Sequence, residues 1–161
     1  MVKTVTLSEG EYYPAEIAED TQFDFGYVSI CTIIFVSRGE FTAAVHMLGT
    51  GFKPDLLKSI INRVKEKSED DGKYIFKVYF SLGETRGGVP VDLPKLEAGS
   101  DLENFYNAVK YCIKTNGIAL REREIRSYIY DSKRENWNPR YNGNGDPENP
   151  PTDLRIITFP G

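Results

Sequence analysis

The chain has 161 residues, a formal net charge of −4, 40% apolar residues and 27% charged residues, as expected for a single globular domain over residues 1–161. Its apolar runs fall short of the roughly 18 residues that indicate a membrane helix. Its one dense basic run, "REREIR", is interleaved with acids. The composition therefore predicts no membrane span and no nucleic-acid partner.

The numbers of cysteine and histidine residues and the placing of glycines exclude several kinds of site. Two cysteines and one histidine are too few for a disulfide framework or a typical zinc site. Phosphate-binding loops of the GxGxxG or GxxxxGK[ST] kind do not occur. We therefore expect neither a metal nor a cofactor. The first residues, "MVKTVTLSEGEYY", lack the apolar stretch of a secretory signal, which argues against Sec export.

The first part of the chain predicts β-strands. Residues 4–7 and 12–19 are expected to form short strands, and Pro14 indicates an edge position for the second. Residues 29–37, "SICTIIFVS", are apolar on both faces, which is typical of a strand covered on both sides. Residues 40–48, "EFTAAVHML", are expected to be its hairpin partner.

Two amphipathic helices are predicted further along the chain. The first covers residues 53–68 and has one apolar stripe, made of Leu56, Leu57, Ile60, Ile61 and Val64. A strand over residues 73–80 precedes the second helix, which begins at a capping box in residues 100–103 and ends at Asn116-Gly117. Cys112 falls on the apolar stripe of this helix, so we expect a core residue rather than a reactive thiol.

The last part of the chain predicts more β-structure. Residues 118–130 are expected to form a long strand with a bulge, because the apolar phase shifts in mid-run. Residues 136–152 are rich in turn formers and predict a surface loop. Residues 153–159 are expected to return as a final strand. Together these elements predict an α+β fold: a mostly antiparallel β-sandwich flanked by two helices.

The predicted hairpin carries one cysteine and the only histidine. If it turns around Arg38-Gly39, Cys31 lies directly opposite His46. Directly opposed side chains share a face, with Cβ atoms ~4.5–5.5 Å apart, whereas a one-residue slip puts them on opposite faces. Strand alternation places Ser29 on the same face as Cys31.

A cysteine beside a histidine suits acyl transfer from amides. The thiolate is the nucleophile, an adjacent imidazolium stabilises it, and the same ring can protonate a departing amine. The structural alternative is that Cys31 is a small apolar residue in a strand and His46 a satisfied core histidine.

Residues 28–46, "VSICTIIFVSRGEFTAAVH", resemble the catalytic segment of the cytotoxic necrotizing factor family of glutamine deamidases. The smaller Burkholderia lethal factor is similar to that family, and the receptor deamidase CheD shares its fold more distantly. The family motif is Leu-Ser-Gly-Cys on one strand, with the catalytic histidine on a following strand. Ser29 and Cys31 match the motif, and His46 matches the histidine in order and separation.

The resemblance implies a catalytic domain that converts a glutamine of a target protein to glutamate through a thioester on Cys31, with His46 as base and acid and Ser29 in support. In the family, a backbone carbonyl or a hydroxyl orients the histidine; here the sequence leaves Thr6, Thr21, Asp24 and Thr50 open. The family's substrate classes are Rho-type GTPases and a translation-initiation RNA helicase. The resemblance therefore implies a monomeric bacterial toxin or effector that another component delivers into the host cytosol.

Two positions depart from the family motif. Val28 stands in place of Leu, and Ile30 stands in place of the Gly beside the nucleophile, where Gly allows close approach of a substrate. The departure at Ile30 favours an alternative, a catalytically inactive binding module on the same scaffold. A CheD-like receptor deamidase, a cysteine protease and a transglutaminase also stay open.

Overall fold

A computed structural model of the chain describes residues 3–7, 12–17, 21–25, 32–47, 52–68, 72–81, 101–130, 140–148 and 154–156. These residues form two sheets and two α-helices. The elements in chain order are β1 (Lys3–Thr6), β2 (Tyr12–Ile17), β3 (Thr21–Asp24), β4 (Thr32–Arg38), β5 (Phe41–Met47), α1 (Pro54–Lys67), β6 (Tyr74–Ser81), α2 (Asp101–Thr115), the 3-10 helix η2 (Leu120–Glu122), β7 (Arg123–Tyr130), β8 (Arg140–Asn142) and β9 (Arg155–Ile156).

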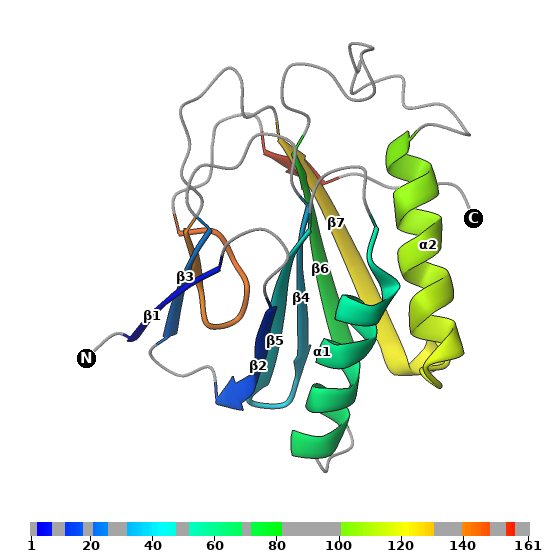
Figure 1. Cartoon of the computed structure of the whole chain (residues 1–161), viewed down its shortest axis with the longest axis horizontal. Helices are drawn as coiled ribbons and strands as arrows, with labels where there is room; N and C mark the ends of the chain where they lie inside the picture. Colours follow the sequence, from blue (N-terminus) through cyan, green and yellow to red (C-terminus); the bar gives the residue numbers. More distant parts are fainter. Residues whose placement is uncertain are drawn as a thin grey trace.

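The larger sheet has the strand order β2-β5-β4-β6-β7-β9, and the smaller sheet has the order β1-β3-β8. Five of the seven strand pairs are antiparallel; β6 with β7 and β1 with β3 are parallel. Figure 1 shows the helices on one side of the larger sheet and the smaller sheet standing apart from them. The predicted α+β fold with mostly antiparallel sheets and two flanking helices is confirmed.

The helix-covered face of the larger sheet holds the main core. Leu57, Ile60, Ile61 and Val64 of α1 are fully buried, and Leu56 packs against them. The predicted stripe of α1 is therefore confirmed. Cys112 is also buried, at 4% exposure, and burial raises the pKa of its thiol, as expected for a core residue.

The opposite face of the larger sheet packs against the smaller sheet. A second core cluster joins strand residues of the larger sheet to aromatic residues of the smaller one: Ile33, Phe35, Ala44 and Tyr79 with Leu7, Phe23, Phe25 and Tyr141. Phe35 lies edge-on to Phe23 and Phe25, with ring centroids 5.3 and 5.8 Å apart. Because both faces of β4 are covered, its side chains are buried in succession, as its apolar sequence predicts.

The surface loop predicted over residues 136–152 is wrong at its centre. Residues 140–142 form β8, which pairs with β3, and Tyr141 is fully buried. Residues 143–148 continue as a tight turn in which the side-chain oxygen of Asn142 accepts hydrogen bonds from two backbone N–H groups. Residues 136–139 and 149–152 lie outside the described part of the chain.

The bulge predicted within residues 118–130 is also wrong. β7 pairs with β6 in one uninterrupted parallel register from Arg123 to Tyr130. The shift of apolar phase comes instead from η2, whose turn precedes the strand. The edge position predicted from Pro14 is confirmed, because β2 is the outer strand beside β5 and its register breaks between Tyr13 and Glu16.

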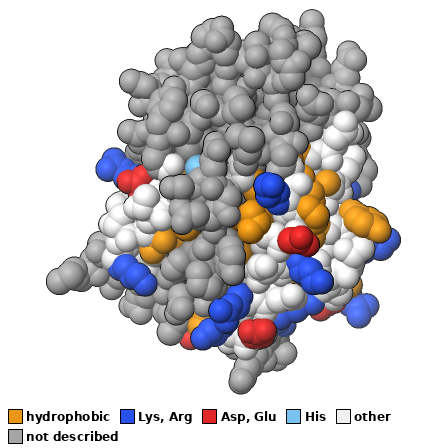
Figure 2. All heavy atoms as spheres, in the orientation of Figure 1, with side chains coloured by type: hydrophobic (Ala, Val, Ile, Leu, Met, Phe, Trp, Pro, Cys, Tyr) orange, Lys and Arg blue, Asp and Glu red, His pale blue; other side chains and the backbone are white. Residues whose placement is uncertain are grey.

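The surface over the helices is mixed in charge. Figure 2 shows basic and acidic side chains interspersed on the face where α1 lies. Neither helix in the described ranges has the length and apolar character needed to cross a bilayer.

Candidate functional site

The hairpin that carries the candidate site has a different register from the predicted one. Arg38 pairs with Phe41 across a two-residue turn at Gly39-Glu40, where Gly39 takes a φ of 60°. His46 therefore lies opposite Ile33, and the predicted direct opposition of Cys31 and His46 is wrong. Because the displacement is an even number of residues, it leaves the two faces of the hairpin unexchanged.

Two of the three predicted site residues cannot be placed against this register. Cys31, the supporting Ser29 and Ile30 lie outside the described residues. The described part of the chain begins again at Thr32. His46 is the predicted site residue that the structure places.

His46 is buried and is held at one ring nitrogen. Its side chain is 3% exposed, and Nδ1 lies 3.0 Å from the carbonyl oxygen of Leu7. Since a carbonyl only accepts, Nδ1 carries the proton and donates this hydrogen bond. In the neutral ring, the lone pair is then on Nε2.

The second ring nitrogen of His46 has no hydrogen-bond partner within the described ranges, although it is buried. Buried polar side-chain atoms are mostly satisfied, so an unpartnered one needs an explanation. An imidazole fixed at Nδ1 with a lone pair on Nε2 has the arrangement that a general base requires. The histidine, cysteine and acidic residues within the described ranges form no cluster of three that could hold a metal ion.

The group that orients His46 is a backbone carbonyl from the other sheet. Leu7 directly follows β1, and its N–H donates to the carbonyl of Asp24 over 3.1 Å, which fixes this backbone against β3. Of the side chains left open by the sequence, Thr6 is exposed and Thr50 lies outside the described residues. Thr21 and Asp24 lie within the described residues, but Nδ1 of His46 hydrogen-bonds to the carbonyl of Leu7. A backbone carbonyl carries no residue-type signal, so the sequence could not reveal it.

Phe25 forms an aromatic wall beside the imidazole. Its ring centroid is 5.5 Å from that of His46, with an interplanar angle of 88°. Phe25 follows β3, so it also comes from the smaller sheet and is itself 4% exposed. Phe25 could not be found from the sequence, because β3 is short and the run "TQFDF" has no clear strand or helix pattern.

The described surroundings of His46 therefore combine a fixed tautomer with apolar walls. The strand row across the larger sheet at this level is His46, Ile33, Tyr79 and Tyr128. Such a setting strengthens electrostatic interactions with any charged group that reaches Nε2. Comparison with known proteins adds no assignment, since neither a family model nor a curated protein sequence matches the chain.

Proposed function

We propose that this protein is a protein-glutamine deamidase in which Cys31 is the nucleophile and His46 is the general base and acid. One observation carries the proposal: His46 is fixed through Nδ1 by the Leu7 carbonyl, while its buried Nε2 has no partner among the described residues. The resemblance of residues 28–46 to the deamidase segment supplies the reaction type.

The observed register supports a diagonal rather than a direct pairing. Cys31 stands two positions before Ile33, the residue opposite His46. In the proposed site, β-alternation continues from Thr32 back to Cys31 and puts its thiol on the face of His46. Diagonal neighbours in an antiparallel pair are ~7–8 Å apart at the backbone, with side chains closer, which suits a thiol approaching Nε2.

The proposed reaction has two stages. The Cys31 thiol gives its proton to Nε2 of His46, and the thiolate attacks the carboxamide carbon of a target glutamine. The tetrahedral intermediate collapses when Nε2 returns that proton to the nitrogen, so ammonia leaves and a thioester remains. Nε2 then takes a proton from water, and the resulting hydroxide attacks the thioester carbon. The C–S bond breaks, and the leaving thiolate takes the proton back from Nε2, which restores the Cys31 thiol and frees the product acid. The acid gives its proton to ammonia, so the sum is glutamine plus water giving glutamate plus ammonium.

Two further groups have proposed roles in this reaction. The backbone N–H of Cys31 donates to the developing oxyanion, as backbone amides do at comparable sites. Ser29 hydrogen-bonds within the site. The Leu7 carbonyl keeps the imidazole in the required tautomer throughout, because it binds Nδ1–H in both charge states of the ring.

The proposed substrate and place of action follow from the resemblance of residues 28–46 to the deamidase segment. The substrate is a protein with an accessible glutamine, of the Rho-type GTPase or translation-initiation helicase class. The protein acts as a monomeric bacterial toxin or effector in the cytosol of a host cell.

The experiment is a deamidation assay on host-cell lysate. Released ammonia is measured, and mass spectrometry locates glutamines converted to glutamate. Cys31→Ser should abolish both signals, whereas Cys112→Ala, which removes the buried second thiol, should leave them unchanged. Conversion that persists in Cys31→Ser would exclude the proposed nucleophile. If Cys31→Ser keeps the biological effect of the protein but converts no glutamine to glutamate, the protein is the binding module instead.

A further inference from the structure

The turn that follows β8 is docked on the larger sheet by two buried side chains of β6. We call β8 and this turn together, residues 140–148, the β8 turn. Lys77 is 6% exposed, and its Nζ donates to the carbonyl of Asn144 at 2.9 Å and to Oδ1 of Asp146 at 2.7 Å. The hydroxyl of Tyr79 donates to the carbonyl of Gly145 at 2.6 Å. Each of these bonds ties the β8 turn to β6.

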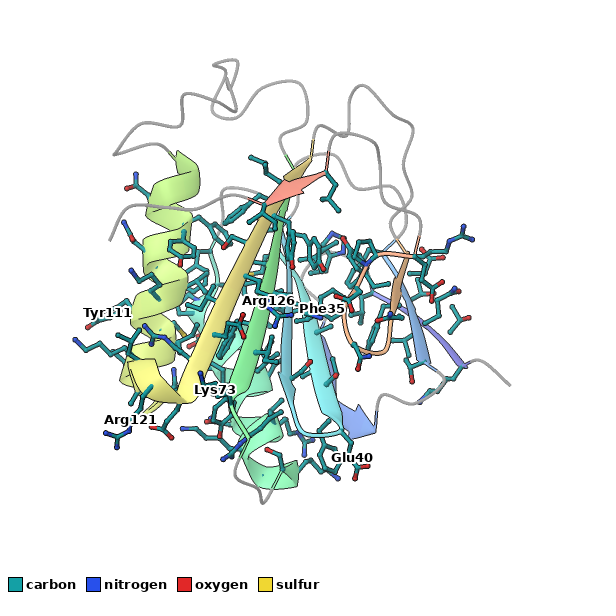
Figure 3. All side chains as sticks on the ribbon, turned by 180° about the vertical axis from the view of Figure 1, so that it is seen from behind. Phe35, Glu40, Lys73, Tyr111, Arg121 and Arg126 are labelled. Carbon is teal, nitrogen blue, oxygen red and sulfur yellow. The ribbon has the colours of Figure 1, made fainter. Side chains whose placement is uncertain are left out.

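Lys77 stands in an unusual place for a charged side chain. In the sheet it lies between Phe35 of β4 and Arg126 of β7, on the face turned away from the helices. Figure 3 shows Phe35 and Arg126 on this face. Arg126 pairs with Glu124, so the Asp146 carboxylate and the Asn144 carbonyl are the groups that satisfy the Lys77 ammonium. A buried ammonium without such partners is strongly unfavourable, so Lys77 depends on the docked turn.

Gly145 lets the β8 turn lie directly against the sheet. Its φ is +79°, and a Cβ built there would come within 2.7 Å of the Phe35 ring. Both the backbone conformation and the space therefore require glycine. The β8 turn is thus fitted to Phe35 as well as hydrogen-bonded to Lys77 and Tyr79.

The β8 turn is connected to His46 through the smaller sheet. Tyr141 of β8 pairs with Phe23 of β3, and its ring lies 5.5 Å from that of Phe25. Phe25 in turn lies 5.5 Å from the imidazole of His46. β3 also binds the N–H of Leu7, whose carbonyl holds Nδ1. Leu7 and Phe25 therefore follow directly on β1 and β3 of the smaller sheet, although His46 itself belongs to the larger one.

We infer that Lys77 and Gly145 are positioning residues for His46: they lock the β8 turn onto the larger sheet, and this holds the Leu7 carbonyl and the Phe25 ring against the imidazole. The smaller sheet is thereby the element that sets the tautomer and orientation of His46. The effect on the imidazole stands on the contacts alone, whereas its consequence for catalysis rests on the proposed function.

The test reads the tautomer of His46 by ¹⁵N NMR, which needs no assignment because the chain has one histidine. The background is Cys31→Ser, so that no thiolate holds a second proton on the ring. We call the contacts of Lys77 and Gly145 that hold the β8 turn on the larger sheet the lock. Two variants disturb the lock by different means, Lys77→Met and Gly145→Ala. Lys73→Met is the matched control, since it removes the same charge from an exposed position just before β6. Hydrogen exchange of β4 and β6 amides verifies that the larger sheet stays folded.

With the lock intact, and in Lys73→Met, a single Nδ1–H form is expected. Both lock variants should show a mixture of the two tautomers. In the chain with Cys31 present, they should also slow alkylation of Cys31 about tenfold or more, as small misplacements of reacting groups do. If Lys77→Met fails to fold, Gly145→Ala decides.

An unchanged Nδ1–H form in a folded lock variant would overturn the inference. A mixed tautomer with unchanged Cys31 alkylation would support the positioning role of the lock and contradict the Cys31–His46 pair, so the two proposals fail separately.

Discussion

Nδ1 of His46 donates to the carbonyl oxygen of Leu7 across 3.0 Å, and this bond joins the two sheets of the fold. His46 lies on β5, the second strand of the larger sheet, and Leu7 directly follows β1 of the smaller sheet. The bond leaves Nε2 buried with no partner in the described ranges. The packing of the two sheets thus determines which nitrogen of the only histidine is available for chemistry.

Cys112 should behave as an inert thiol. Burial raises its pKa, so the reactive thiolate is scarce near neutral pH, and the side chain is 4% exposed. Iodoacetamide should label Cys112 in the folded Cys31→Ser variant far more slowly than in the urea-unfolded one. Equal rates in the folded and unfolded states would contradict the assignment of Cys112 to the core.

Tyr79 should make the protein sensitive to alkali. Burial, with a smaller effect of Tyr128, raises the pKa of its hydroxyl well above the ordinary value. The folded state therefore holds this proton more tightly than the unfolded state does, so its stabilising contribution is complete below about pH 10 and declines as pH rises further. In Tyr79→Phe, the loss of stability above about pH 10 should be shallower by up to about 1.4 kcal/mol per pH unit.

The control for the alkaline effect is Tyr111→Phe, the same chemical change at a side chain that is 70% exposed. The unfolding free energies of wild type and both variants, measured by urea denaturation from neutral to alkaline pH, give the slopes. Parallel curves for Tyr79→Phe and wild type would show that Tyr79 ionises as readily in the folded state as in the unfolded one.

Phe25 should contribute more to stability than a partly exposed phenylalanine. It contacts Phe35, Tyr141 and His46 in the core between the sheets. Phe25→Ala should lower the free energy of unfolding by about 3–5 kcal/mol. Phe52→Ala removes the same atoms from a half-buried site beside Phe105 and should cost less. Equal costs in thermal or urea unfolding would mean that the cluster between the sheets is loosely packed.

The helices and the main strands could be predicted because their patterns are long and periodic. The stripe from Leu57 to Val64 repeats at helical spacing, and Tyr74, Phe76, Val78 and Phe80 alternate on one face of β6. β8 could not be predicted, since it has three residues and only Tyr141 among them is apolar. Its burial depends on β3 and on Phe35, which are distant in sequence.

The register of the β4–β5 hairpin could not be predicted from the sequence. Both Arg38-Gly39 and Gly39-Glu40 offer Gly39 as a turn residue, and the choice between them moves the partner of His46. The observed turn gives a continuous ladder from Arg38 with Phe41 to Thr32 with Met47. The orienting Leu7 carbonyl was equally hidden, because it depends on how two sheets pack and not on a side chain.

The measurement that tests the Cys31–His46 pair most directly is the rate of iodoacetamide labelling of Cys31 at about pH 6, where an ordinary thiol is almost entirely protonated. The two proteins are Cys112→Ala and the same chain with His46→Ala, each verified as folded by circular dichroism. We predict rapid labelling in the first and a rate lower by at least about tenfold in the second, because the imidazolium stabilises the thiolate. Slow labelling that is the same in both proteins would contradict the pair and, with it, the proposed deamidase.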